Sequence, residues 1–221
     1  MKFYLVVMVT LASALAAVCQ SDPWKNVYTE SAWKERDSWQ RADEIIKHLK
    51  IQQGSHVADI GSHEGYMTFK LSQVVGKTGK VWAVDVDAYK LEKLRQHAVS
   101  RNALNIETIK GDYDNPHLPA NALDAVIILD TYHEMDDHDK ILAHIKTALK
   151  KNGRLVLCEP IAESRRSAAR SAQEARHELG MNFALQDLEK AGFKVRSQID
   201  PFADRVKIKG DVMWLVVAEK E

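Results

Sequence analysis

The order of apolar segments is the feature that most constrains the fold of this chain. From Ser55 onward, short apolar runs alternate with amphipathic stretches of helical period, beginning with HVADI, GYMTFKLSQVVG, KVWAVDV and YKLEKLRQHAVSRN. Strands and helices that alternate in this way predict a parallel sheet with right-handed crossovers. The run Leu123–Leu129 is apolar except at Asp124, as expected for a central strand covered on both faces. We therefore predict an α/β fold with a doubly wound sheet.

The segments before and after this alternation differ from it. The last two apolar runs, KVRSQI and DVMWLVVAEK, follow each other without a helix, which predicts that they are antiparallel neighbours. Residues 20–50 hold three of the five Trp and end in a helical pattern of Ile45, Ile46 and Leu49. We expect a helical arm at 20–50 and one domain at 51–221.

One helix end can also be predicted. The stretch HDKILAHIKTALKKNG has helical period, and its last basic residues and glycine are typical of a helix C-terminus. We expect this helix to close at Lys150, Lys151 and Gly153, before the strand RLVLCEP.

Composition fits one globular domain and excludes one class of partner. The chain has 221 residues, 45% of them hydrophobic, which is enough to bury a full core. Its 31 basic and 31 acidic side chains give a formal net charge of +0, and no run of Lys and Arg supplies a local positive field. We therefore expect no nucleic acid as a partner. Cys158 lies in the apolar run RLVLCEP and is expected to be a buried core thiol.

Residues 1–19 have the pattern of a secretory signal peptide. After one Lys, an uncharged apolar run extends to Val18, and Ala14 and Ala16 suit a small-residue cleavage site. A membrane anchor or a packed first helix are alternatives, although the run is short for a span and has no basic flank after it. We expect an exported protein, periplasmic or secreted. A lipid on Cys19 is the one membrane attachment that this segment allows.

The stretch VADIGSHEGY carries the strongest functional signal. It begins as a buried strand and breaks at Asp59 into a turn that holds Gly61 and Gly65. Glycines at a strand end can be ordinary turn residues, but a carboxylate and a glycine-bearing turn before a helix also make a nucleotide-sized site. Ligands of open parallel sheets bind at the carboxyl ends of the strands. Three further acidic residues come at or just beyond such ends: Asp85, Asp112 and Asp130.

These motifs resemble, in order and spacing, the class I S-adenosylmethionine-dependent methyltransferases across nearly all of 51–221, and most closely exported bacterial members of that family. The family's first motif has an acidic residue followed by glycines at the second, fourth and sixth places, where this chain has Gly61, His63 and Gly65. The segments WAVDVD, IKGDYD, LDTYHEM and ALKKNGRLVLCEP resemble its later motifs. The resemblance implies a Rossmann-like seven-stranded sheet with the last strand antiparallel, and S-adenosyl-L-methionine as cofactor.

The resemblance also implies the site. Asp85 would accept hydrogen bonds from both ribose hydroxyls and Asp112 from the adenine amino group. The side chains of Tyr66, Val86 and Tyr113 would lie against the adenine ring. The cofactor-binding residues implied are Asp59, Gly61, Gly65, Tyr66, Asp85, Val86, Asp112, Tyr113 and Asp130. His133 is a candidate general base for a small-molecule methyl acceptor, with Glu134 as its orienting partner. Alternatively, His133 caps the next helix or packs beneath Tyr132.

Two other function classes stay open. The first is a non-catalytic nucleoside-binding module of the same fold, which His63 in place of glycine favours. The second is an NAD-dependent oxidoreductase, which the absence of a third correctly placed glycine and of a nearby Lys or Arg for phosphate disfavours. The substrate pocket should be covered by the N-terminal arm, DTYHEM and Ile161–Phe183. Within the last segment, Arg165, Arg166 and His177 either meet an anionic substrate or line a solvated helix face.

No metal is predicted, although DTYHEMDDHD is rich in His, Asp and Glu. Neither His133 nor His177 has a His four residues later, so the zinc-protease pattern is absent, and acidic residues are expected at a helix N-terminus. Some proteins of the fold bind a divalent metal at the ends of the fourth and fifth strands, where this chain has Asp130 and Glu159. The usual Asp-Asn pair is absent from CEPI.

Overall fold

The computed structural model describes residues 30–221. The predicted signal peptide at 1–19 and the first part of the predicted arm lie outside the described residues. The strands are β1 (His56–Ile60), β2 (Lys80–Asp85), β3 (Ile106–Lys110), β4 (Leu123–Leu129), β5 (Leu149–Ile161), β6 (Lys194–Arg205) and β7 (Asp211–Glu219). The helices are α1 (Glu30–Gln40), α2 (Ala42–Leu49), α3 (Tyr66–Val75), α4 (Ala88–Ser100), α5 (His138–Ala148), α6 (Arg170–Glu174), α7 (Met181–Lys190) and α8 (Val206–Lys209), with 3-10 turns η1 (Tyr132–Glu134) and η2 (Glu163–Arg165).

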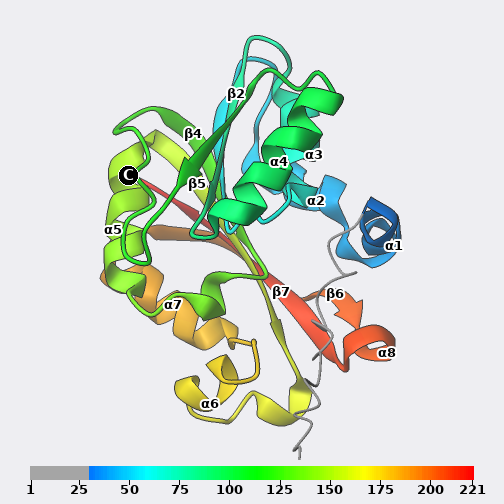
Figure 1. The fold of residues 1–221 in the computed structure, drawn as a ribbon. Helices are drawn as coiled ribbons and strands as arrows, with labels where there is room; N and C mark the ends of the chain where they lie inside the picture. The colour runs from blue at the N-terminus through cyan, green and yellow to red at the C-terminus, as the bar shows by residue number, and fades with distance from the viewer. Residues whose placement is uncertain (1–29) are drawn as a thin grey trace, which may run out of the picture.

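The seven strands form one sheet in the order β3-β2-β1-β4-β5-β7-β6, with helices on both faces (Figure 1). The pairs from β3 to β5 are parallel, whereas β7 is antiparallel to both β5 and β6. The predicted α/β fold, its doubly wound sheet and its antiparallel last strand are therefore confirmed. Strand order reverses between β1 and β4, which is where ligands bind in sheets of this kind.

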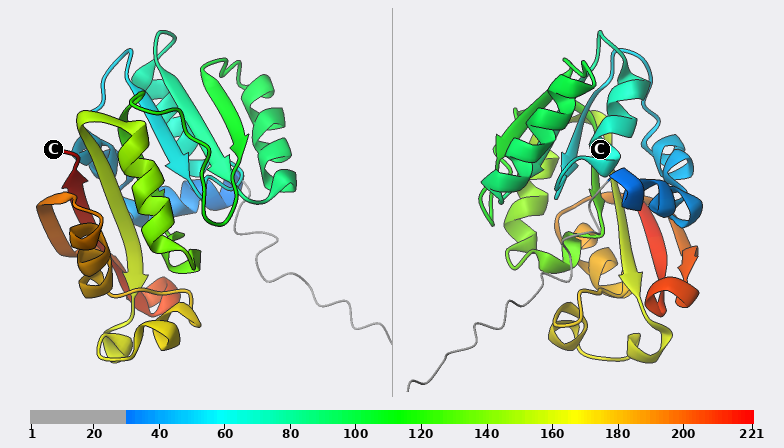
Figure 2. Two further views of the ribbon diagram at one scale, coloured as in Figure 1. Left: turned by 90° about the vertical axis from the view of Figure 1, so that its left-hand side faces the viewer. Right: turned by 45° about the vertical axis from the view of Figure 1, so that its right-hand side comes forward.

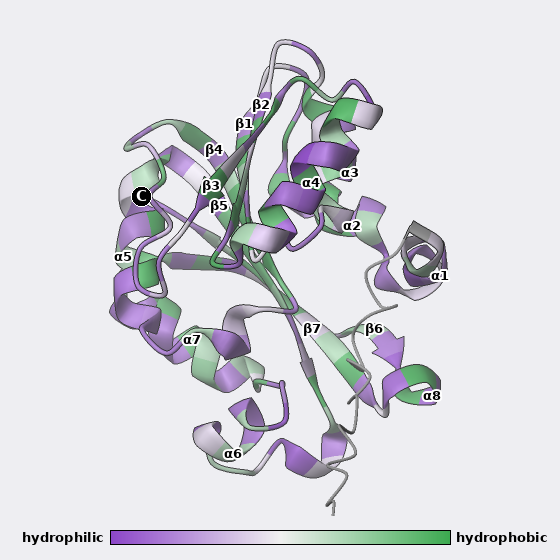
Figure 3. Ribbon diagram, in the orientation of Figure 1, coloured by the Kyte–Doolittle hydropathy of each residue, from purple (hydrophilic) through white to green (hydrophobic). Residues whose placement is uncertain are grey.

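The core has two layers because successive strand residues point to opposite faces. On one face α2 and α3 pack against side chains such as Ala125 and Ile127, and on the other α5 and α7 pack against Val126 and Ile128. Hydrophobic residues follow the strands at the centre of the sheet (Figure 3). As expected, β4 is covered on both faces, and Cys158 is a buried free thiol.

The helix before β5 is shorter than predicted. It ends at Ala148, and Leu149 already pairs with Leu123 of β4. Leu149 is fully buried and Lys150 reaches the Asp124 carboxylate at 2.6 Å, so both side chains have partners that a continued helix would remove. The basic residues and the glycine thus lie at the start of a strand.

The N-terminal helices pack on the sheet domain. Helix α1 contacts β6, and α2 contacts α3 and β5 (Figure 2). Ile45 and Leu49 are buried in the same core layer as α3, and the Trp33 ring lies 6.3 Å from that of Tyr66 and 6.0 Å from that of Phe69. Helices α1 and α2 therefore share a hydrophobic core with the domain. Among residues 30–221, no helix has both the length and the apolar character that crossing a membrane requires.

Replacing Ile45 tests whether this shared core is energetically coupled to the sheet. Ile45→Ala should lower the free energy of unfolding by about 2–5 kcal/mol, because it leaves a cavity beside α3. Urea unfolding followed by circular dichroism measures the change, and Leu104→Ala, at a side chain that is 85% exposed, is the control. A cost no larger than that of the control would show that α2 does not stabilise the domain.

Candidate functional site

A cavity of about 380 Å³ opens at the carboxyl ends of β1, β2 and β4, at the reversal of strand order. The sheet side supplies the turn after β1, the end of β2 and the turn after β4, while α1 and α8 supply the opposite wall. Acidic side chains in its lining are Glu35, Asp59, Glu64, Asp85 and Asp130, and basic ones are Arg36 and Lys209. The cavity therefore offers charge of both signs to one ligand.

Asp85, at the end of β2, is held by the glycine-bearing turn beside it. Its carboxylate accepts hydrogen bonds from the backbone N–H groups of His63 at 2.8 Å and of Asp87 at 2.9 Å. Burial raises the pKa of Asp85. Because a carboxylate can accept about four hydrogen bonds, both oxygens keep capacity for a ligand's hydroxyl groups.

Asp59 lies deeper, within β1. It is 2% exposed, and its carboxylate accepts a hydrogen bond from the Thr68 hydroxyl at 2.6 Å. Burial raises the pKa of Asp59 to about 6. The side chain is thus a buried carboxylate at the floor of the cavity, supported by the first turns of α3.

The turn after β1 needs its glycines. Gly61 has a φ of +76°, and a Cβ at this position would overlap the Thr131 side chain from the turn after β4. Gly65 has a φ of +105°, and a Cβ there would lie 2.6 Å from the Phe69 ring. His63, where the resembled family has glycine, adopts a φ of +47° and still directs its N–H to Asp85. The turn therefore keeps a left-handed residue at this place without a glycine.

Of the predicted cofactor residues, Asp59, Gly61, Tyr66, Asp85 and Asp130 line the cavity. The Tyr66 ring packs edge-on against Trp33, and its hydroxyl donates to Asp37 at 2.8 Å. Gly65 lies one residue before α3 and shapes the turn rather than the wall.

Three further predicted residues do not line this cavity. Tyr113 and Val86 are 73% and 40% exposed, respectively. The Asp112 carboxylate contacts His117 at 2.7 Å, and its backbone N–H bonds to Asn115, so the loop after β3 turns back on itself. The predicted contacts of Val86, Asp112 and Tyr113 with the adenine stay a prediction, and a ligand would have to extend beyond this cavity to make them.

Asp130 lines the cavity but is already paired. The Arg205 guanidinium lies 3.0 Å from its carboxylate and bonds Asp211 at 2.6 Å. Burial alone would raise the pKa of Asp130, but Arg205, with Arg36 and Lys209, holds it at about 2. Asp130 thus anchors Arg205 to the end of β4, which no motif in the sequence indicated.

His133 lies outside the cavity, in a closed polar network. Its Nδ1 is 2.5 Å from the fully buried Glu159 carboxylate, and its Nε2 is 3.2 Å from Glu134. Burial alone would lower the pKa of His133, but the carboxylates of Glu159 and Glu134 raise it well above the usual value. The general-base role of His133 stays a prediction. Before it can accept a proton from a substrate, the imidazole must lose the proton that Glu159 and Glu134 stabilise.

The structure adds several residues to the site that the sequence alone did not assign to it individually. Glu159 orients His133, a role that the sequence assigned to Glu134, and Ser62 Oγ is buried without a hydrogen-bond partner among residues 30–221. Trp33 and Trp39 of α1 line the cavity, so the arm predicted to cover the substrate pocket borders this cavity. The three Trp in residues 20–50 were the sequence feature that could have indicated this role of the arm.

The two arginines proposed for an anionic substrate are engaged with carboxylates. Arg165 pairs with Glu178 and donates to it through Nε at 2.8 Å. Arg166 pairs with Glu163 at 2.6 Å and with Asp200 at 2.7 Å. These pairs favour a structural role.

Comparison with known proteins identifies the architecture. Residues 57–153 match the family described as methyltransferase domain. A solved S-adenosylmethionine-dependent methyltransferase from Aquifex aeolicus superposes with a TM-score of 0.71 at 22% identity, covering 88% of this chain and 100% of that one. The chain has the methyltransferase fold. The matched family and the Aquifex aeolicus protein are methyltransferases, the enzyme class that the sequence resemblance implied.

Two further proteins broaden this comparison. The ubiquinone/menaquinone biosynthesis C-methyltransferase UbiE of Francisella tularensis subsp. holarctica is 29% identical over 117 residues, which are 52% of this chain and 47% of that protein. The geranyl diphosphate C-methyltransferase from Streptomyces coelicolor, solved with S-adenosyl-L-homocysteine, has a TM-score of 0.69 at 13% identity and covers 82% of this chain and 76% of that one. The chain spans about half the length of the curated relatives it matches.

The raised pKa of Asp59 predicts how stability depends on pH. Because the native state keeps this carboxyl protonated up to about pH 6, whereas an unfolded Asp ionises near pH 4, wild-type stability should fall as pH rises through this interval. Asp59→Asn has no carboxyl group to ionise at this position, so it should be more stable than wild type by roughly 1–3 kcal/mol above pH 6. This difference in unfolding free energy should shrink toward pH 4. Urea unfolding at several pH values measures it. A gap independent of pH would show that Asp59 ionises normally.

Proposed function

We propose that this protein is an S-adenosylmethionine-dependent methyltransferase that acts on a small-molecule acceptor. The observation that carries the proposal is the position of Asp85 beside the Gly61 turn, in a cavity at the reversal of strand order. A carboxylate there can accept hydrogen bonds from both hydroxyls of a ribose. The family match and the methyltransferases of the same fold support this activity.

The residues of the cavity fit the cofactor. Ser62 Oγ is a buried polar atom that a ligand can satisfy, and the absence of a side chain at Gly61 lets Thr131 pack against the turn that borders the cavity. Asp59 and Asp85 suit a cationic sulfonium and a ribose, while Arg36 and Lys209 offer positive charge to the carboxylate of a methionine moiety. A dinucleotide is less suited, because the turn after β1 offers carboxylates where a pyrophosphate needs cations.

The chain's contribution to methyl transfer is mainly positional. When bound, the cofactor supplies an activated methyl group for in-line displacement, so acceleration comes largely from holding acceptor and methyl together. Trp33 and Trp39 of α1 line the cavity and offer flat apolar surface to the ligand, and Asp85 would orient its nucleoside end. A base is needed only for an acceptor that must lose a proton.

A nucleoside-binding module without turnover is the second candidate function. It rests on His63 in place of the glycine of the resembled family, although His63 keeps a left-handed φ and its N–H bond to Asp85. Transfer of a labelled methyl group to a panel of small acceptors separates the two, because a module binds the cofactor without forming product. Export is a separate proposal that depends on residues 1–19.

Replacing Asp85 tests the proposed cofactor site. Asp85→Ala should weaken binding of S-adenosylmethionine by roughly 1.5–3 kcal/mol, through loss of charge-assisted hydrogen bonds. Isothermal titration calorimetry of both proteins gives the difference.

The matched control is Asp112→Ala, because Asp112 also follows a strand but lies outside the cavity. Its affinity should equal that of wild type. Equal affinity of wild type and Asp85→Ala would remove Asp85 from the site, and a loss in Asp112→Ala alone would move the nucleoside to the loop after β3.

A further inference from the structure

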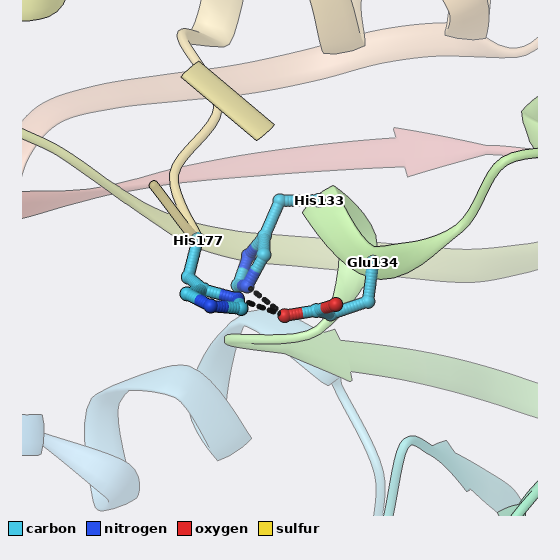
Figure 4. A group of neighbouring side chains, drawn as sticks. All are labelled: His133, Glu134 and His177. Carbon is cyan, nitrogen blue, oxygen red and sulfur yellow. Dashed lines mark hydrogen bonds and ion pairs between the residues drawn. The ribbon is translucent and has the colours of Figure 1, made fainter. Parts of the chain in front are cut away.

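Three side chains with metal-binding groups meet outside the proposed cofactor cavity. His133 and Glu134 come from η1 after β4, and His177 comes from the loop after α6 (Figure 4). One donor atom from each lies within 4.8 Å of the other two. The Glu134 carboxylate contacts both imidazoles, at 3.2 Å from His133 Nε2 and in a close contact with His177 Nδ1. Segments 43 residues apart in sequence thus converge on one carboxylate.

The orientation of His133 is fixed from behind. Its Nδ1 faces Glu159 at 2.5 Å, so its Nε2 is the nitrogen directed at Glu134. Glu159 is fully buried at the end of β5 and also accepts the backbone N–H groups of Thr131 at 2.7 Å and Tyr132 at 2.9 Å. Metal-binding histidines commonly have such a carboxylate on the second ring nitrogen, which selects the tautomer and raises ligand basicity. The His133 ring therefore has the orientation and the carboxylate partner that are typical of a metal-binding histidine.

We propose that His133, Glu134 and His177 bind a Zn²⁺ ion, with Glu159 holding His133 in place. Two imidazoles and one carboxylate are a ligand set of zinc sites that keep a fourth position open for water or substrate. Bonds of about 2.0–2.1 Å in a tetrahedron place ligand atoms about 3.4 Å apart, close to the observed separation of His133 Nε2 and Glu134. His133 and Glu134 therefore already have the spacing of zinc ligands, and the exposed His177 side chain would move outward to take the third position.

The donor chemistry selects the kind of ion. Mg²⁺ and Ca²⁺ prefer sites made of oxygen ligands, whereas two imidazoles suit Zn²⁺ and other late first-row metals. Glu134 and His177 are 53% and 59% exposed at their side chains, so the site has an entry path, while His133 is 4% exposed. The bound ion would join the loop after α6 to the turn after β4, two residues from Thr131 in the cofactor cavity. Its open position could then hold an oxygen or nitrogen atom of an acceptor.

Zinc binding is measurable without methyl transfer, so the proposal can fail or hold independently of the proposed function. The full chain is treated with a chelator, dialysed and titrated with Zn²⁺ alone by calorimetry. One ion per chain should bind. Co²⁺ in place of Zn²⁺ should give the visible absorption of a tetrahedral site at the same stoichiometry.

Three variants assign the ion to this cluster. Glu159→Gln should weaken Zn²⁺ binding by about 10–100-fold, as expected for loss of a carboxylate behind a ligand. His177→Ala, at an exposed side chain that should not affect folding, should weaken it by more than this. His144→Ala, at an exposed histidine of α5, should bind as wild type does. Thermal melts should show a Zn²⁺-dependent rise for wild type and His144→Ala but not for His177→Ala.

Two results would overturn the proposal. The first is a wild-type protein that binds no Zn²⁺ in the titration. The second is a His177→Ala variant with wild-type affinity, which would assign the bound ion to other residues and the cluster to a metal-free network of hydrogen bonds.

Discussion

The fully buried carboxylate of Glu159 fixes the part of the molecule on which both proposed sites depend. A carboxylate removed from water is costly unless it is hydrogen-bonded, and Glu159 is compensated by the backbone N–H groups of Thr131 and Tyr132 and by the His133 ring. These bonds tie the turn after β4 to the end of β5. The same turn places Thr131 against Gly61 on one side and directs His133 toward Glu134 on the other.

Around this turn, elements from the two ends of the described chain complete the cavity. Helix α1 contributes Trp33 and Trp39, and α8 contributes Ile208 and Lys209. The 2% exposed Arg205 joins β6 to Asp130 at the end of β4, and to Asp211 at the start of β7. Because Asp130 is neutralised in this way, the carboxylates that offer negative charge to a ligand from the sheet are mainly Asp59 and Asp85. The charge pattern of the cavity therefore results from pairing across the sheet, not from the number of acidic motifs.

Local sequence pattern predicted what local forces determine. The period of apolar residues and their order were enough for the sheet, its crossovers and its antiparallel last strand, and the turn after β1 was predictable because Gly61 and Asp85 belong to short motifs. Asp112 and Tyr113 lie outside the cavity lining, because a residue's position after a strand does not set the direction of the following loop, and His117 and Asn115 turn that loop back. Arg205 with Asp130, 75 residues apart, and His177 with Glu134 are tertiary contacts that no local periodicity encodes.

The central claim is that the cavity between the carboxyl ends of the strands and helix α1 holds the nucleoside of S-adenosylmethionine. A crystal structure of the protein with S-adenosyl-L-homocysteine tests it most directly. The account predicts the ribose hydroxyls within hydrogen-bond distance of the Asp85 carboxylate, with the ligand packed over the Gly61 turn and beneath Trp33. A ligand bound elsewhere, or a cavity that stays unchanged at saturating ligand while Asp85 contacts only backbone, would contradict it.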